Sequence, residues 1–310
     1  MPEDFERLLR RYHAKESVDA RAFQPRARLL QSIWRQQQGY DPAEYRGKLR
    51  GARIPMPWAK ETLANYMTPT IKGVVRDEVM DRDKAEGKLY GKPRIFNNLL
   101  SSQPLCFNLF GELQQDLDLA SRVLEQLSDG RFETVTAIEF EHSPGRGDAR
   151  YTSDNSAFDV FFETRNSNGQ ASFIGIEVKY HENLKDEPAP HRSTYDRVAD
   201  NMGCFDAPTR PRLRERPLQQ IWRDHLLAGS MLKRGDSDDG LFVFLSPSAN
   251  EYCREAVASY QSCLTDERTF SAWSLEDVVD AVRDVTDAEW IDDVWNRYLN
   301  FGKIEAHSDD

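Results

Sequence analysis

Two carboxylates and a lysine lie in a part of the chain whose pattern predicts β-strands. Asp159 is near the start of the apolar segment 158–164, and Glu177 and Lys179 lie in a second apolar segment, 171–180. Because alternate residues of a strand share a face, the side chains of Glu177 and Lys179 are predicted to project together. Charged groups in apolar strands are unfavourable unless they have partners. This placement therefore indicates a chemical role.

A hairpin turn is predicted at Asn168-Gly169, between these two segments. Pairing about this turn places Asp159 opposite residue 178, and one step of register in either direction places it beside Glu177 or Lys179. The two carboxylates and the lysine are therefore expected to converge at one end of the hairpin.

Such a group suits metal-assisted hydrolysis of a phosphodiester bond. Carboxylate oxygens bind Mg²⁺, and the bound metal polarises the phosphate and acidifies a water molecule. Lys179 would orient or deprotonate that water and offset developing negative charge. The alternative is a structural cross-strand ion pair between Lys179 and a carboxylate. The upstream Asp159 at hairpin distance, with helical segments on both sides, favours the catalytic interpretation.

The pattern Asp159 followed by Glu177-Val178-Lys179 resembles the core motif of the PD-(D/E)XK nuclease superfamily, which has the restriction-endonuclease-like fold. Segments 98–111 and 220–227 are similar to a bacterial branch of stand-alone restriction-endonuclease-like proteins. The resemblance implies an α/β fold, with a central mixed β-sheet flanked by helices and an added helical N-terminal region. It implies Asp159 and Glu177 as Mg²⁺ ligands and Lys179 as the catalytic lysine, with Mn²⁺ as a substitute metal.

Further site residues are expected on two helices. Many members of the superfamily carry a glutamate on the helix before the sheet, and Glu112 lies at that position as a candidate third ligand; a solvated helix carboxylate is the alternative. Related nucleases place a glutamine or basic residue on the helix after the core, where Gln220 and Arg223 are three residues apart and can share a face. Gln219 and His225 lie on the same predicted helix, 217–233.

Asp154 is a rival to Asp159 as a metal ligand. The residue before Asp159 is Phe158 where the superfamily often has proline, which leaves the ligand assignment open between the two aspartates. Asp159 is preferred because it alone lies on the predicted strand at the hairpin spacing.

Three regions are predicted along the 310 residues: a helical, basic N-terminal region over 1–94, the nuclease core over 95–250, and C-terminal helices packed on the core over 251–310. The first hundred residues hold 20 Lys and Arg against 13 Asp and Glu, whereas the rest hold 21 against 39. Phosphate affinity follows local positive potential. Candidates for backbone binding are therefore Lys92, Arg94 and the cluster Arg46, Lys48, Arg50 and Arg53.

The composition is that of a globular protein, with 39% hydrophobic and 30% charged residues. The apolar run 241–245 is far shorter than the roughly 20 residues of a membrane helix, and no secretory signal is visible. We expect a cytoplasmic protein without a membrane partner. The four cysteines form no CxxC pair, so neither a zinc site nor a disulfide framework is expected.

The predicted function is a metal-dependent nuclease, in particular an Mg²⁺-dependent endonuclease acting on DNA. The alternative is a catalytically silent protein on the same fold that binds nucleic acid or a partner protein, with phage defence as one setting. A homodimer is also compatible with the sequence, because restriction-type cleavage of both strands commonly uses two copies.

Overall fold

The computed structural model describes residues 3–307, which divide into two compact units. The described part of the first unit lies within residues 1–112, 249–251 and 287–310, and the second comprises Leu113–Ser248 and Tyr252–Thr286. The predicted boundaries at residues 94 and 250 stay a prediction.

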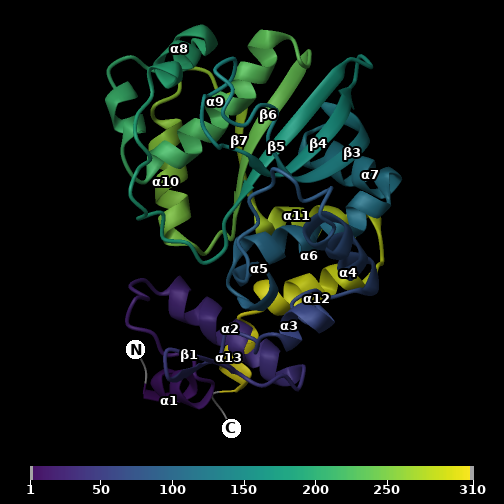
Figure 1. The fold of residues 1–310 in the computed structure, drawn as a ribbon, viewed down its shortest axis with the longest axis vertical. Coiled ribbons are helices and arrows are strands. Elements are labelled where there is room, and N and C mark those ends of the chain that lie inside the picture. Colours follow the sequence, from purple (N-terminus) through teal and green to yellow (C-terminus); the bar gives the residue numbers. More distant parts are fainter. Residues whose placement is uncertain (1–2, 308–310) are drawn as a thin grey trace. The chain divides into compact units, whose positions relative to one another are not determined.

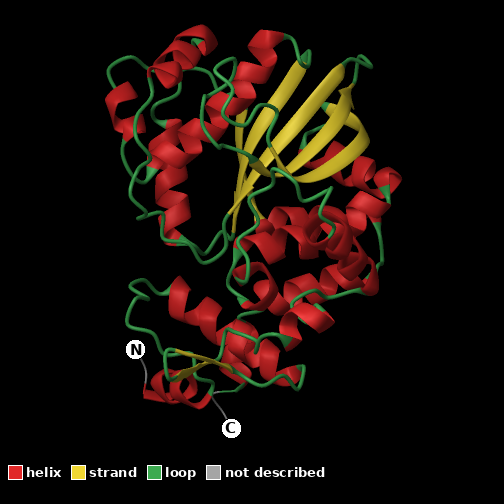
Figure 2. Cartoon of the chain, viewed as in Figure 1, coloured by secondary structure: helices red, strands yellow, loops and turns green. Residues whose placement is uncertain are grey.

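The second unit is built on a five-stranded mixed sheet (Figures 1 and 2). Its strands follow the order of the sequence: β3 (Phe132–His142), β4 (Phe158–Asn166), β5 (Ala171–Val178), β6 (Asp239–Ser246) and β7 (Phe270–Ser274). The first three form an antiparallel meander, and β6 and β7 join β5 in parallel. The predicted central mixed sheet is thereby confirmed.

The β4–β5 hairpin has a register one residue away from the first expectation. Val160 pairs with Ile176, so the next residues outward, Asp159 and Glu177, are neighbours at the end of the ladder. Arg165 pairs with Ala171, so the turn is centred on Asn168. Within the turn, the Asn166 side chain accepts hydrogen bonds from the amides of Asn168 and Gln170 at 3.0 and 3.1 Å.

One face of the sheet is covered by helices that lie between β5 and β7 in the chain. They are α8 (Ser193–Met202), α9 (Leu218–Arg234) and α10 (Glu251–Gln261), the last of which belongs to this unit from Tyr252 onward. α9 contacts both β5 and β6 and packs against α8 (Figure 1). The core beneath them is aromatic and buries Phe173, Phe242 and Trp222. This packing holds α9 over the strand that carries Glu177.

The opposite face presents Val160, Ile176 and Val243, all fully buried. The helix α7 (Leu117–Leu127) packs on β3, and α11 (Leu275–Val285) packs on α7. The sheet is therefore apolar on both faces, as expected of a strand layer between helices.

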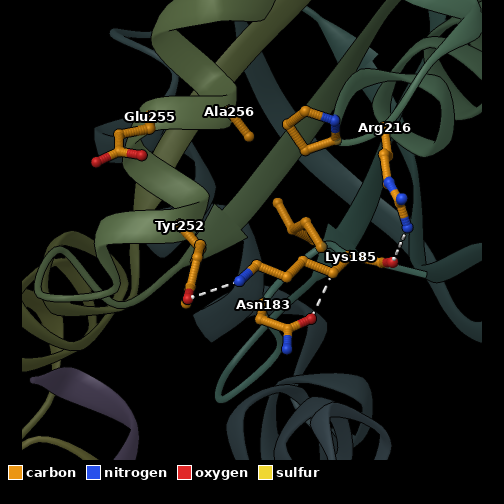
Figure 3. A pocket seen from close by; sticks show the side chains of 8 residues that line it. Asn183, Lys185, Arg216, Tyr252, Glu255 and Ala256 are labelled. Carbon is orange, nitrogen blue, oxygen red and sulfur yellow. Dashed lines mark hydrogen bonds between the residues drawn. The ribbon is translucent and has the colours of Figure 1, made fainter. Parts of the chain in front are cut away.

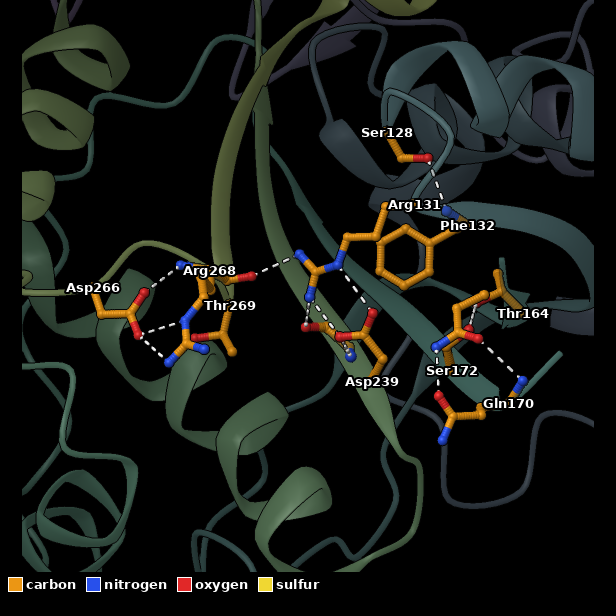
Figure 4. A network of polar contacts seen from close by, with 12 residues as sticks. Ser128, Arg131, Phe132, Thr164, Gln170, Ser172, Asp239, Asp266, Arg268 and Thr269 are labelled. Atoms are coloured by element: carbon orange, nitrogen blue, oxygen red, sulfur yellow. Dashed lines mark hydrogen bonds and ion pairs between the residues drawn. The ribbon is translucent and has the colours of Figure 1, made fainter. Parts of the chain in front are cut away.

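A bidentate ion pair lies at the end of the sheet where β3 and β6 begin (Figure 4). The Arg131 guanidinium, at the start of β3, donates to the two carboxylate oxygens of Asp239 on β6 at 3.0 and 2.5 Å. It also donates to the carbonyl of Arg268, just before β7, at 2.7 Å. Planar two-point pairing fixes orientation as well as distance. These contacts tie the first strand to the two parallel strands.

Three elements of this unit were not predicted. The segment between β5 and α9 contains α8 and the 3-10 helix η2 (Arg210–Arg214), and β7 is a short strand after α10. Polar side chains dominate α8, and β7 has only five residues, so their sequence signals are weak.

The first unit is mainly helical. A buried arginine on α12 joins three of its segments. The Arg297 guanidinium donates to Gln31 at 3.1 Å and to the Asn65 carbonyl at 2.7 Å, and it lies 3.9 Å from the centre of the Trp34 ring. Its elements are α1 (Glu3–Arg11), α2 (Phe23–Gln37), β1 (Ala43–Tyr45), β2 (Lys48–Arg50), α3 (Trp58–Thr62), α4 (Pro69–Val75), η1 (Arg76–Met80), α5 (Arg94–Asn97), α6 (Ser102–Gln115) up to Glu112, α12 (Glu289–Tyr298) and α13 (Gly302–Ala306).

Within residues 3–307, every helix is too short or too polar to cross a bilayer.

Candidate active site

Asp159 is held at the end of the β4–β5 ladder by the backbone of the neighbouring strand. Its Oδ2 atom accepts a hydrogen bond from the amide of Val178 at 2.9 Å. Burial, together with the negative charge of Glu177, raises the pKa of Asp159 well above its ordinary value. The two carboxylates belong to adjacent positions at the end of the β4–β5 ladder.

Glu177 and Lys179 project from the same face of β5, as alternation predicts. They are 5% and 8% exposed, and the Lys179 ammonium donates to Glu177 Oε1. The Lys179 backbone is anchored to the parallel strand by a 2.8 Å hydrogen bond from its amide to the carbonyl of Leu245. Burial acts to lower the pKa of Lys179, but the Glu177 carboxylate outweighs it and the pKa is raised. The lysine is therefore a firmly held cation.

Gln220 reaches this ion pair from α9. Its Nε2 atom donates to Glu177 Oε1 at 2.6 Å, so the oxygen that receives the Lys179 ammonium also receives the amide. The structure thus brings together four of the predicted site residues: Asp159, Glu177, Lys179 and Gln220. Their roles remain predictions.

Asp224 is a feature that the sequence reasoning missed. It lies one helical turn after Gln220 on α9, is 4% exposed, and its Oδ2 atom has no hydrogen-bond partner within the described part of the chain. Burial and then the charge of Glu177 raise its pKa well above the ordinary value. The i, i+4 spacing from Gln220 was the available signal, since these positions share a helix face.

Asp154 has a structural environment quite unlike that of Asp159. Its two oxygens accept five hydrogen bonds, including those from the Tyr195 hydroxyl at 2.7 Å and from Arg223 Nε at 2.8 Å. Burial acts to raise the pKa of Asp154, but Arg223 and these donors lower it to about 2. The carboxylate links the loop before β4 to α8 and α9. Arg223 is accordingly part of a buried ion pair rather than a surface one.

Gln219 and His225, the other polar candidates on α9, support the fold. The Gln219 side chain accepts from the Ala189 amide at 2.6 Å and donates to the Ala189 carbonyl at 2.7 Å. The ring nitrogens of His225 lie 2.8 Å from the hydroxyls of Tyr260 and Thr269. Burial lowers the pKa of His225 to about 3, so it is a neutral core histidine at physiological pH.

Glu112 belongs to the first unit, on α6. Its carboxylate accepts a hydrogen bond from the hydroxyl of Thr68, which caps the N-terminus of α4 by accepting from the Ile71 amide at 3.1 Å. This contact shows a structural use for Glu112, and its role as a third metal ligand stays a prediction.

Several basic residues predicted to bind phosphate have partners within the first unit. Arg50 pairs with Glu16, the Arg53 guanidinium lies 4.9 Å from the centre of the Tyr45 ring, and Lys92 donates to the carbonyl of Val79 at 2.8 Å. Burial lowers the pKa of Arg53. Their contact with nucleic acid stays a prediction.

Phe158 occupies the position before Asp159 for a packing reason. A Cβ atom placed on Gly175 would lie 2.5 Å from a carbon of the Phe158 ring. Phe158 also stacks on Phe161, with ring centres 5.7 Å apart. Gly175 is therefore the small residue that lets this ring pack over β5, two residues before Glu177.

The carboxylates of Asp159 and Glu177 suit a hard divalent cation. Mg²⁺ is commonly held by one or two carboxylates together with substrate phosphates, and a cation between these two side chains would relieve their repulsion. Across residues 3–307, no trio of His, Cys, Asp or Glu side chains forms a ready-made metal cage.

Comparison with known proteins agrees with this chemistry. The family model of the PD-(D/E)XK nuclease superfamily matches residues 17–300. The chain therefore belongs to that superfamily, whose members are nucleases that generally use divalent metals. The match extends well beyond the 95–250 that the motifs alone covered. No curated protein and no solved structure matches the chain.

Proposed function

We propose that this protein is a divalent-metal-dependent endonuclease that hydrolyses phosphodiester bonds in DNA. The observation that carries the proposal is the cluster in which Gln220 and Lys179 both donate to Glu177 while Asp159 lies beside it. Buried carboxylates are unfavourable unless they have partners, and a divalent cation is a partner that would balance the charges of Asp159 and Glu177.

In the proposed site, Asp159 and Glu177 hold the cation, with Mg²⁺ as the expected metal and Mn²⁺ as a substitute. When bound, such a cation polarises the scissile phosphate and offsets charge in the transition state. Asp159 is oriented for this role by the Val178 amide, which leaves its second oxygen for the metal. The Gln220 amide holds the Glu177 carboxylate in a single orientation.

Lys179 provides the positive charge beside the scissile phosphate. Its ammonium is fixed through the ion pair with Glu177 and through the backbone hydrogen bond to Leu245. Preorganised charge in a water-poor site stabilises a transition state more strongly than mobile charge does. Glu112 remains the proposed third ligand, and the basic residues of the first unit remain proposed contacts to the phosphate backbone.

The test is a cleavage assay with purified protein on supercoiled plasmid, linear duplex, single-stranded DNA and RNA, each with Mg²⁺, Mn²⁺ or EDTA. Lys179→Ala is the inactive variant, and Lys233→Ala, at an exposed lysine near the end of α9, is its matched control. We expect metal-dependent nicking of supercoiled plasmid that persists in the control and disappears in Lys179→Ala.

Cleavage that survives in Lys179→Ala would contradict the proposed site. Binding of nucleic acid without cleavage under any metal condition would instead support the catalytically silent alternative.

A further inference from the structure

The second unit contains a pocket of about 470 Å³ (Figure 3). Its walls come from three segments of the second unit: the loop after β5, the start of α9, and the first turns of α10. The volume lies within the range of pockets that hold small organic ligands, roughly 300–1,000 Å³. None of the residues assigned above to catalysis lines it.

The pocket lies at the carboxyl ends of the parallel strands β5 and β6. The loop after β5 and the helix after β6 both leave the carboxyl ends of these parallel strands. Ligands of open α/β sheets occupy the crevice outside such ends. Pro217, which lines the pocket, is three residues before Gln220, which contacts Glu177.

The loop that lines the pocket begins directly after Lys179. The Lys179 amide donates to the carbonyl of Leu245 on β6 at 2.8 Å. The Tyr180 amide donates to the Glu182 carboxylate at 2.7 Å, and Asn183, the first lining residue, follows Glu182. The loop therefore connects the pocket to the strand end that carries Glu177 and Lys179.

The lining combines apolar surface with one aromatic ring. Leu184, Pro217 and Ala256 provide aliphatic surface, and Tyr252 provides the ring (Figure 3). The Lys185 ammonium lies 4.7 Å from the centre of that ring and donates to the Tyr252 hydroxyl at 3.1 Å. A flat, partly apolar ligand is the class that such walls favour.

Charged side chains at the pocket fit an anion attached to that flat ligand. Lys185 is exposed, and the Arg216 side chain is 53% exposed, with donors to the Lys185 carbonyl at 3.1 Å and to Glu187 at 2.8 Å. Exposed ion pairs of this kind contribute little stability, so a phosphate can replace Glu187 at low cost. The Glu255 carboxylate lines the same pocket and can accept from an exocyclic amino group.

We propose that this pocket binds one unstacked nucleotide of the substrate strand, with its base against Tyr252 and its phosphate against Lys185 and Arg216. The inference rests on the proposed nuclease function and specifies its substrate. A base enters a pocket only after it leaves the stack. The substrate class is therefore DNA with a single-stranded or locally unpaired nucleotide next to the scissile bond.

The test uses a short single-stranded oligodeoxynucleotide carrying one 2-aminopurine, titrated with the full-length protein in EDTA so that no cleavage occurs. Stacking on Tyr252 is expected to quench the fluorescence in a saturable manner. Stacking of a base on an aromatic side chain contributes about 1–3 kcal/mol, so Tyr252→Ala is expected to weaken binding about 5- to 150-fold. Tyr252→Phe, which keeps the ring, is expected to bind within about twofold of the unmodified protein.

The phosphate contacts are tested by the salt dependence of the same titration. Arg216→Ala is expected to reduce the slope of log K against log salt by about 0.7, the contribution of one phosphate contact on a single strand. Lys233→Ala is expected to leave the slope unchanged. A fully paired duplex with 2-aminopurine at its centre is expected to show no quenching beyond that of the duplex itself.

Equal quenching in Tyr252→Ala and the unmodified protein would overturn the inference. The inference would also be overturned if Arg216→Ala changed the salt slope while the affinity did not depend on Tyr252. The pocket would then bind phosphate alone and not the base. The binding titrations contain no metal, so they are independent of the cleavage assay. If the unmodified protein binds in a Tyr252-dependent manner but cleaves no plasmid, the nuclease function is rejected and the pocket is not. Cleavage without Tyr252-dependent binding would reject the pocket alone.

Discussion

The Gln220 amide and the Glu177 carboxylate are joined by a 2.6 Å hydrogen bond between α9 and β5. This contact connects a helix after the meander to the strand that carries the proposed metal ligand. It also limits the orientations open to Glu177, because the same oxygen receives the Lys179 ammonium.

Replacing Gln220 by leucine should reduce turnover with little change in KM, because the amide positions a ligand and does not bind the distant parts of the substrate. A hydrogen bond to a charged group contributes about 1.5–3 kcal/mol, so we expect kcat to fall about 10- to 150-fold. Steady-state cleavage kinetics measure this, with Gln261→Leu on the exposed part of α10 as control. A rise in KM at constant kcat would show that Gln220 binds substrate instead.

Asp159→Asn should abolish cleavage without loss of stability, whereas Asp154→Asn should lower the stability of the fold. Asp159→Asn removes a proposed metal ligand whose charged form is disfavoured in the folded protein, so cleavage should disappear while stability is kept or gained. Asp154→Asn breaks the buried pair with Arg223 and should cost about 3–5 kcal/mol. Urea unfolding and plasmid cleavage distinguish them. An inactive but fully stable Asp154→Asn would make Asp154 the ligand.

Asp224→Asn should stabilise the metal-free protein at neutral pH. The folded pKa of Asp224 is raised above its unfolded value, so the folded state binds more protons and stability falls as pH rises from about 4 through the folded pKa. The variant should therefore gain about 1–3 kcal/mol at pH 7.5 and nothing at pH 3.5. Urea unfolding in EDTA at both values measures the difference. An equal gain at both pH values would show that ionisation of Asp224 is not the cause.

Divalent cation should stabilise the folded protein through Asp159 and Glu177. A ligand at 100 times its Kd contributes about 2.7 kcal/mol, so Mg²⁺ should raise Tm by a few degrees and EDTA should reverse the effect. Glu177→Gln should lose most of this shift, whereas Asp284→Asn on the exposed side of α11 should keep it. A shift that persists in Glu177→Gln would place the cation elsewhere.

Gly175→Ala should destabilise the hairpin, because the added methyl group would collide with the Phe158 ring at 2.5 Å. Overpacking of this kind costs about 1–3 kcal/mol. Combining it with Phe158→Leu should recover part of the loss, and a double-mutant cycle by thermal unfolding measures the coupling. Strictly additive effects of the two substitutions would argue against this contact.

The strand positions of the site could be predicted because their signals are local. Alternation along β5 places Glu177 and Lys179 on one face, and the Asn168-Gly169 turn brings Asp159 to the same end within one residue of register. Family membership likewise depends on residue types at short spacings, and the comparison confirmed it.

The contribution of α9 could be predicted only in part. The helix itself has a clear apolar period, and it ends at Gly235, whose positive φ of 76° suits glycine. Which polar residues face the sheet depends on how the helix is rotated against β5 and β6. Gln220 was expected near the site, but the buried carboxylate of Asp224 was not.

The sequence by itself determined the meander, the strand face that carries the charged residues, and the nuclease family, because all three follow from spacings of a few residues. Only the tertiary structure decided the partners of each carboxylate: Asp154 accepts from Tyr195 and Arg223, Asp159 accepts from the Val178 amide, and the Oδ2 atom of Asp224 has no hydrogen-bond partner in the described part of the chain. The physical reason is that desolvation and pairing depend on neighbours far away in the sequence.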